Sequence, residues 1–150
     1  MPRGSSGGTV GARVGDSRPA EAETLGAFQR RYWQAWDGGD LAGVGACLSA
    51  DFQGLLAGPD GAPAFEVDRE GVLSLLRSSL RQASGQRVHW RRDGVVVLER
   101  GPDEAAAMMR VVCDYPDRPE WSNVELTLEA YRRGDDGRWL LARASSERLR

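Results

Sequence analysis

The most constraining feature of this chain is a stripe of large apolar side chains between residues 25 and 36. Leu25, Phe28, Tyr32 and Trp36 follow one another at intervals of three and four residues. At 3.6 residues per turn, this spacing places one aliphatic and three aromatic side chains on one face of a helix. A helix face of this kind must be covered, so the stripe predicts a helix packed against another layer of the fold.

The flanking residues give this helix defined ends. Thr24 is a suitable N-cap, and Gly38 and Gly39 can end the helix in a left-handed conformation. Asp40 can then cap a second, short helix over residues 41–48. The segment therefore predicts a helix, a tight turn, a short helix and the start of a strand.

One further helix and a run of strands are predicted after residue 51. Asp68 can cap a helix that closes at Gly85, because leucines at 73, 76 and 80 recur at helical spacing. Turn residues then separate expected strands at 88–90, 95–98, 105–115, 124–131 and 138–145. This order predicts an α+β domain in which a curved antiparallel sheet wraps around the aromatic helix.

Length and composition predict one domain that follows an N-terminal tail. The chain has 150 residues, of which 41% are hydrophobic, and this suits a single core. Residues 1–23 are mostly small, polar or charged and contain few large apolar side chains. We expect them to form a disordered tail, and we expect the domain to span residues 24–150.

Charge and hydropathy exclude two classes of partner. The net charge of −2 is spread over interspersed acidic and basic residues, so no basic stripe predicts nucleic-acid binding. No apolar run is long enough for a membrane span, and the first residues lack the apolar core of a signal peptide. A cytoplasmic protein is therefore expected. All 20 basic residues are Arg, and Ile is absent, which indicates a genome rich in G and C such as that of an actinobacterium.

Metal and disulfide chemistry are not expected. Cys47 and Cys113 have no CxxC spacing and are interpreted as reduced, buried residues. His89 is the single histidine, which leaves too few ordinary ligands for a zinc site. A Ser–His–acid triad would have to use His89, which lies in a predicted strand, and the sequence has no GxSxG elbow between a predicted strand and a predicted helix. The sequence therefore predicts no metal and no cofactor.

Three segments carry a resemblance to a known family. They are YWQAWDGGD at residues 32–40, LSADF at 48–52 and DGRWLL at 136–141. With them the chain resembles, over residues 24–149, the SnoaL-like members of the nuclear transport factor 2-like superfamily. That superfamily has a cone-shaped, cystatin-like fold and includes ketosteroid isomerases and polyketide cyclases.

The resemblance implies a small-molecule enzyme that acts on a largely apolar substrate. Isomerisation, cyclisation or ring opening assisted by acid/base groups is implied, in a bacterial natural-product pathway. The superfamily also contains noncatalytic ligand-binding and dimerisation modules, and this alternative stays open because fold does not imply function.

Tyr32 is the strongest catalytic candidate. It stands eight residues before Asp40, as does the tyrosine of ketosteroid isomerases that donates a hydrogen bond to the developing enolate oxygen. Such a donor in a dry pocket contributes about 2.7–4 kcal/mol of transition-state stabilisation. The alternative is a core tyrosine, because aromatic residues on the inner face of a helix usually serve packing.

Two acidic residues are the candidates for proton transfer. The general-base aspartate of ketosteroid isomerases has no match, since the equivalent position is Leu56, and Asp60 replaces it only if residues 57–61 fold inward. Glu129 falls at the place of the family's second acid. Alternation allows either the row of Leu128 or the row of Glu129 to line the cone, and the apolar row is the simpler expectation.

The expected ligand is a hydrophobic small molecule held by side chains along the cone. The candidates for binding it are Phe28, Trp36, Trp90 and Arg143, the last because it alternates with Leu141 along the final strand. The long apolar runs at 95–98 and 108–113 exceed what one covered face requires. They predict a homodimer joined through the outer face of the sheet.

Overall fold

The computed structural model describes residues 22–58 and 61–149 of the chain. The elements follow the order α1 (Leu25–Asp37), α2 (Leu41–Cys47), β1 (Leu48–Leu56), β2 (Phe65–Asp68), α3 (Arg69–Gln82), β3 (His89–Glu99), β4 (Glu104–Asp114), a 3-10 helix (Pro119–Trp121), β5 (Asn123–Arg133) and β6 (Trp139–Leu149). The predicted tail and Asp60 lie outside the described residues, apart from positions 22 and 23.

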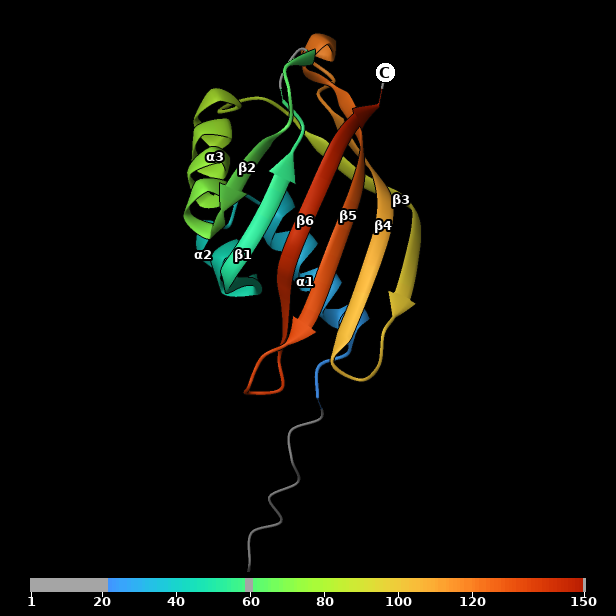
Figure 1. Ribbon diagram of the computed structural model, residues 1–150. Helices are drawn as coiled ribbons and strands as arrows, with labels where there is room; N and C mark the ends of the chain where they lie inside the picture. Colours follow the sequence, from blue (N-terminus) through green and yellow to red (C-terminus); the bar gives the residue numbers. More distant parts are fainter. Residues whose placement is uncertain (1–21, 59–60, 150) are drawn as a thin grey trace, which may run out of the picture.

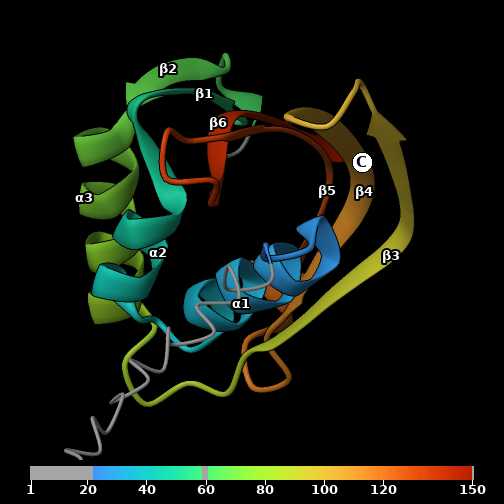
Figure 2. The ribbon, with the colours of Figure 1, turned by 90° about the horizontal axis from the view of Figure 1, so that it is seen from below.

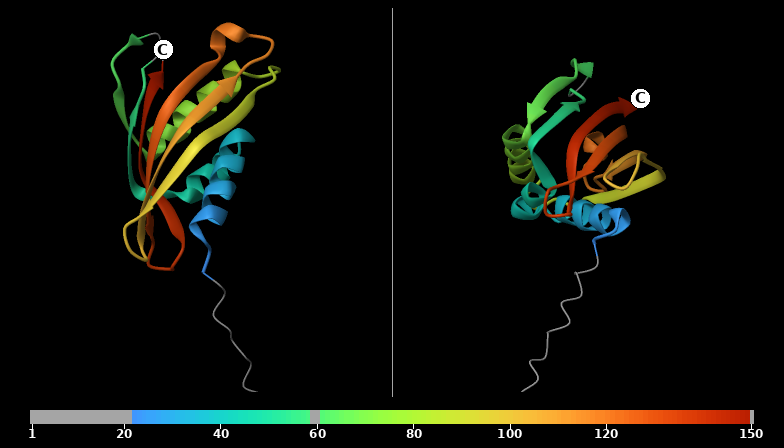
Figure 3. Two further views of the ribbon diagram at one scale, coloured as in Figure 1. Left: turned by 90° about the vertical axis from the view of Figure 1, so that its right-hand side faces the viewer. Right: turned by 60° about the horizontal axis from the view of Figure 1, so that its bottom comes forward.

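The strands form one curved sheet in the spatial order β2-β1-β6-β5-β4-β3 (Figure 1). Seen from below, this sheet bends around α1, while α2 and α3 lie at the end formed by β1 and β2 (Figure 2). The side views show α1 on one side of the sheet and no helix on the other side (Figure 3). The expected α+β cone is confirmed, with one difference: β1 and β6 pair in parallel, whereas all other described pairs are antiparallel.

Local capping fixes where the helices begin. The side chains of Thr24, Asp40 and Asp68 each accept a hydrogen bond from the backbone N–H three residues later, at 3.2, 2.9 and 2.8 Å. After α1 the chain turns through Gly39 with φ of 68°, where a Cβ atom would lie 2.6 Å from the Leu80 side chain. The turn between α1 and α2 is therefore fixed both by backbone conformation and by packing.

Two predicted boundaries differ from the structure. α3 ends at Gln82, and Gly85 instead turns the loop that follows with φ of 79°. The strands expected at 88–90 and 95–98 are one strand, β3, with a register shift between Asp93 and Val96. That irregularity is a bulge in a continuous strand, so no turn separates the two segments.

The expected orientation of β5 is wrong. Glu129 and Tyr131 are 6% and 2% exposed, whereas Leu128 is 49% exposed. The polar row therefore faces α1, and the apolar row lies on the outer face. The physical reason is that hydrogen bonds inside the cone satisfy the polar groups of this row, as described below.

A bulge places Arg143 on the outer face. Tyr131 pairs with Leu141, but Ala130 pairs with Arg143, so β6 has one extra residue at this point. The alternation of β6 is thereby reversed. Arg143 is exposed and in register with Gln53 of β1 on its other side. The expectation that Arg143 reaches the interior is corrected, because it assumed uninterrupted alternation from Leu141.

The interior is a single apolar core between α1, the sheet, α2 and α3. Its largest members are Phe28, Tyr32, Val44, Leu48, Phe52, Val72, Leu76, Met109, Tyr131, Trp139 and Leu141. Phe28 has no exposed surface, and its burial contributes roughly 1.5–3 kcal/mol to folding. The predicted aromatic stripe therefore forms the inner wall of the cone.

Candidate active site

A buried carboxyl group lies at the centre of the inner face. Glu129 projects from β5 between alanines of β4 and β6, which are in register with it. The Tyr131 hydroxyl donates a hydrogen bond to the Glu129 carboxylate from two positions along the same strand. Burial raises the pKa of the Glu129 carboxyl above its usual value, and the hydrogen bond from Tyr131 opposes that rise.

Gln29 of α1 fixes the direction of this hydrogen bond. Its side-chain Nε2 donates to the Tyr131 hydroxyl oxygen at 3.1 Å, and Gln29 is itself 5% exposed. Because the amide nitrogen can only donate, the Tyr131 hydroxyl accepts a hydrogen bond from Gln29. Its own O–H is therefore free to donate a hydrogen bond to Glu129. Burial and the nearby Glu129 carboxylate raise the pKa of Tyr131, so its phenol stays protonated.

Tyr32 lies next to this chain of hydrogen bonds. Its ring stacks on Phe28 at 6.4 Å between centroids and is tilted against Trp36 at the same distance. Tyr32 is 7% exposed, and none of the described residues forms a hydrogen bond with its hydroxyl. Burial and then the charge of Glu129 raise the pKa of Tyr32 well above its usual value. The phenol is therefore a neutral donor beside a carboxyl group.

A cationic group closes one side of the site. Arg92 of β3 forms a two-pronged ion pair with Asp37 at the end of α1, with both N–O distances at 2.9 Å. Its guanidinium also lies 5.2 Å from the centre of the Trp33 ring. The Arg92 side chain is only 11% exposed, and its charge lowers the pKa of both Glu129 and Tyr32.

The arrangement has the elements of an acid/base site in an apolar interior. A buried carboxyl group whose pKa is raised is a candidate for proton transfer. A neutral phenol beside it can donate a hydrogen bond to an oxygen that gains negative charge. These two groups, Glu129 and Tyr32, come from different elements and meet on the inner face.

The structure brings together some of the predicted site residues and separates others. Phe28 and Tyr32 line the inner wall, with Trp36 half-buried beside them. Trp90 is half-buried on β3, two residues before Arg92, and pairs with Cys113. Arg143 is on the opposite face, and no geometry is described for Asp60.

Sequence reasoning missed Gln29, Trp33, Arg92 and Tyr131. Two signals were present. Gln29 and Trp33 are four residues apart and border the aromatic stripe of α1, and Tyr131 shares the face of Glu129 by alternation. The contact of Arg92 with α1 spans 55 residues, and no local pattern predicts it.

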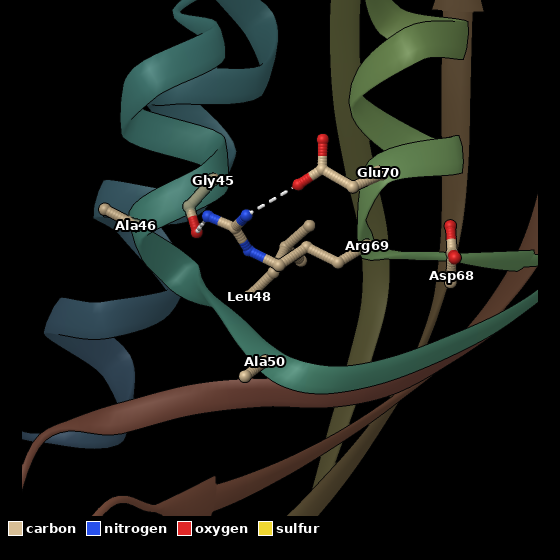
Figure 4. A pocket seen from close by; sticks show the side chains of 7 residues that line it. All are labelled: Gly45, Ala46, Leu48, Ala50, Asp68, Arg69 and Glu70. Carbon is tan, nitrogen blue, oxygen red and sulfur yellow. Dashed lines mark hydrogen bonds and ion pairs between the residues drawn. The ribbon is translucent and has the colours of Figure 1, made fainter.

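A shallow hollow lies outside the cone. It has a volume of about 480 Å³ and is open to solvent between α2, the start of β1 and the start of α3 (Figure 4). Arg69 crosses it and donates to the Gly45 carbonyl oxygen at 2.8 Å while pairing with Glu70. A second hollow of about 380 Å³ lies between α1 and α2. Neither contains Glu129 or Tyr32.

Comparison with solved structures identifies the fold. An NTF2-like protein of unknown function from Pseudomonas putida matches with a TM-score of 0.67 at 19% identity, covering 80% of each chain. An NTF2-like protein with a cystatin-like fold from Novosphingobium aromaticivorans matches with a TM-score of 0.65 at 18% identity, covering 81% of this chain and 77% of that one. The chain has the NTF2-like fold.

A further solved structure that resembles this chain is described as a ketosteroid isomerase-like protein. It comes from Erwinia carotovora, with a TM-score of 0.59 at 19% identity, and covers 89% of this chain and 99% of that one. No protein-family model matches the sequence, and no curated protein matches it. The NTF2-like fold, which includes isomerase-like members, is thus established by structure rather than by sequence.

Two further properties of the described residues bear on partners. None of the helices in this part of the chain is both long and apolar enough to cross a membrane. Within residues 22–58 and 61–149, no three His, Cys, Asp or Glu side chains are grouped so as to hold a metal ion.

Proposed function

We propose that this NTF2-like protein is a SnoaL-like enzyme that acts on a largely apolar carbonyl compound by acid/base-assisted isomerisation, cyclisation or ring opening. The observation that carries the proposal is the buried Glu129 carboxyl beside the neutral Tyr32 phenol. Buried ionisable groups in an apolar site are costly for stability and are often found where proton transfer occurs.

Each group has a distinct role in this proposal. The Tyr32 hydroxyl donates a hydrogen bond to the carbonyl oxygen of the ligand, and this bond strengthens as that oxygen becomes an enolate. Glu129 takes a proton from the carbon next to the carbonyl and returns it to another carbon or to the same one. Trp36 supplies apolar contact surface, which favours a ligand of low polarity, and the fully buried Phe28 supports the Tyr32 ring.

A specific observation also favours a second candidate, a noncatalytic ligand-binding or dimerisation module. Both hollows described above lie outside the cone, and both Trp33 and Trp36 pack against the core. In this case the interior would serve mainly to hold the fold together, and Glu129 would be a structural group.

The outer face of the sheet supports a homodimer under either candidate. Val96, Met108 and Leu128 are in register across β3, β4 and β5, and they are 58%, 42% and 49% exposed. Leu55 on β1 and Leu98 on β3 are also exposed, at 46% and 56%. An apolar row across a sheet face that no helix covers is typical of a protein–protein interface.

Hydrogen–deuterium exchange into carbonyl compounds tests the enzymatic proposal without knowledge of the natural substrate. Hydrophobic cyclic ketones and enones are incubated with the protein in D₂O, and loss of the proton next to the carbonyl is followed by NMR. We expect catalysed exchange in the wild type, strong loss in Glu129→Gln and at least tenfold loss in Tyr32→Phe. Glu99→Gln, on the exposed end of β3, is the control.

The two candidates give different results in this experiment. Exchange that survives Glu129→Gln would exclude Glu129 as the proton-transfer group. Binding of the ketones without exchange in the wild type would favour the noncatalytic module.

A further inference from the structure

The indole of Trp33 carries a buried hydrogen-bond donor that has no partner. Its Nε1 atom is inaccessible to solvent, and no described residue accepts a hydrogen bond from it. A buried donor left in this state costs free energy, and most such groups in native proteins are satisfied. An unpaired donor in the interior therefore calls for a physical explanation.

The buried Glu129 carboxyl is an acceptor of matching chemistry. Tyr131 donates to one of its oxygens, Oε2, and no described residue donates to the other. Trp33 is close enough to lower the pKa of this carboxyl, although the two groups do not reach hydrogen-bond geometry. A donor without a partner thus lies beside an acceptor with capacity for one more bond.

Arg92 holds the Trp33 ring in this position. The guanidinium lies over the ring at 5.2 Å from its centre and is fixed from the other side by its ion pair with Asp37. This stacking ties α1 to the edge strand β3. The indole is thus held by Arg92 on one face, while its N–H is buried.

We propose that Trp33 is a positioning residue for Glu129, and that Arg92 holds its indole so that the N–H donates to the carboxylate whenever Glu129 is ionised. The ionised carboxylate then has two donors, Tyr131 and Trp33, and the neutral acid needs only one. The role of Glu129 in proton transfer rests on the proposed function, whereas the contact of Trp33 with Glu129 does not.

Few other ionisable groups face this carboxyl. The group that faces it from α1 is Tyr32, and the group that faces it from β3 is Arg92, which is paired with Asp37. On its own strand it meets Tyr131, and the residues that flank it on β4 and β6 are Ala107 and Ala144. A change at Trp33 is therefore not masked by other charges on the neighbouring strands.

The test is the titration of Glu129 itself, followed by carbon-13 NMR of protein labelled at the glutamate carboxyl carbon. The Glu129 signal is assigned by its disappearance in Glu129→Gln. Trp33→Phe keeps an aromatic ring under Arg92 and removes only the N–H-bearing part of the indole. We expect the titration midpoint of Glu129 to move to higher pH, because the ionised form loses a donor.

Trp139 provides a matched control. Its indole nitrogen is also buried without a partner, and Arg133 lies over its ring at 4.5 Å from the centre. Trp139 pairs with Arg133, which lies four residues from Glu129 along β5. Trp139 does not contribute to the pKa of the Glu129 carboxyl. Trp139→Phe should leave the Glu129 midpoint unchanged.

Two further variants keep the inference open to refutation. Tyr131→Phe removes an established donor and must raise the midpoint, which shows that the measurement detects such a loss. Arg92→Gln removes a nearby positive charge and also releases the indole, so it should raise the midpoint more in the wild type than in Trp33→Phe, where only the effect of the charge remains. If Trp33→Phe folds and leaves the midpoint at its wild-type value while Tyr131→Phe raises it, the inference is wrong.

The outcome separates the inference from the proposed function. A raised midpoint in Trp33→Phe together with undiminished proton exchange in Glu129→Gln would retain the role of Trp33 and exclude the catalytic role of Glu129. An unchanged midpoint in Trp33→Phe together with lost exchange in Glu129→Gln would exclude the role of Trp33 and retain the catalytic role of Glu129.

Discussion

The Tyr131 hydroxyl donates a hydrogen bond to the Glu129 carboxylate, and both side chains lie on the inner face of β5. Gln29 on α1 donates to the same hydroxyl, so the chain of donors runs from helix to strand and ends on the carboxylate. This polar chain crosses an otherwise apolar interior. It fixes one carboxylate oxygen and leaves the other without a protein donor, next to Tyr32 and Trp33.

The buried Glu129 should make the stability of the protein depend on pH. Its pKa is raised in the folded state, so its contribution is full below the unfolded value of about 4.3 and is lost as the pH rises through the folded value. Glu129→Gln removes this titration and keeps an oxygen that accepts from Tyr131. We expect the variant to match the wild type at acidic pH and to become more stable than the wild type as the pH rises.

Urea unfolding of both proteins between pH 4 and pH 8 measures this difference. Glu99→Gln, at an exposed position, serves as the control for the loss of one negative charge. A wild type that gains stability relative to Glu129→Gln as the pH rises would contradict the assigned direction of the pKa.

The beginning of the domain gives a second prediction. Residues 1–20 carry few large apolar side chains, whereas Thr24 caps α1 and Glu23 pairs with Arg31 at 3.0 Å. Removal of residues 1–20 should leave the melting temperature unchanged within error. Thr24→Ala should lower the free energy of unfolding by about 1 kcal/mol, because the cap is lost. A large drop on truncation would place the domain boundary earlier.

The helix boundaries were predictable because they depend on local chemistry. Thr24, Asp40 and Asp68 cap the three α-helices as their residue types predict, and Gly39 takes the positive φ expected of a glycine at a helix end. Capping requires only side chains within three residues of each other. The same holds for the aromatic stripe, whose spacing alone places Phe28 and Tyr32 on one face.

The orientation of β5 and the position of Arg143 were not predictable from local pattern. Alternation reveals two faces of a strand but not which one is inside, and here hydrogen bonds from Gln29 allow the row of Glu129 to be buried. A single extra residue in β6 then reverses the face of Arg143. Both outcomes depend on contacts between segments about 100 residues apart or on a bulge that has no strong sequence signal.

The exposed row on the outer face predicts that the protein is a dimer. Leu128 lies near the middle of this row, in register with Met108. We expect the wild type to have about twice the chain mass of 16.4 kDa in light scattering at micromolar concentration, and Leu128→Glu to be monomeric. The control is Leu75→Glu on α3, since Leu75 is 38% exposed and lies away from the sheet face. A monomeric wild type would exclude the interface.

The paired behaviour of Tyr32→Phe and Tyr131→Phe distinguishes a binding group from a structural one. The Tyr32 hydroxyl has no partner among the described residues, so its removal should change the free energy of unfolding by no more than about 0.5 kcal/mol. The Tyr131 hydroxyl makes two hydrogen bonds, and its removal should cost about 1–3 kcal/mol.

Ligand affinity should fall in Tyr32→Phe, the variant that leaves stability nearly unchanged. If the Tyr32 hydroxyl donates to a bound carbonyl oxygen, Tyr32→Phe should weaken binding of a hydrophobic cyclic ketone at least tenfold, which is about 1.4 kcal/mol. Binding is followed by tryptophan fluorescence, because the Trp36 ring lies 6.4 Å from that of Tyr32. A Tyr32→Phe protein that loses stability yet binds the ketone normally would show that Tyr32 is a packing residue, and the case for an enzyme would then depend on Glu129 alone.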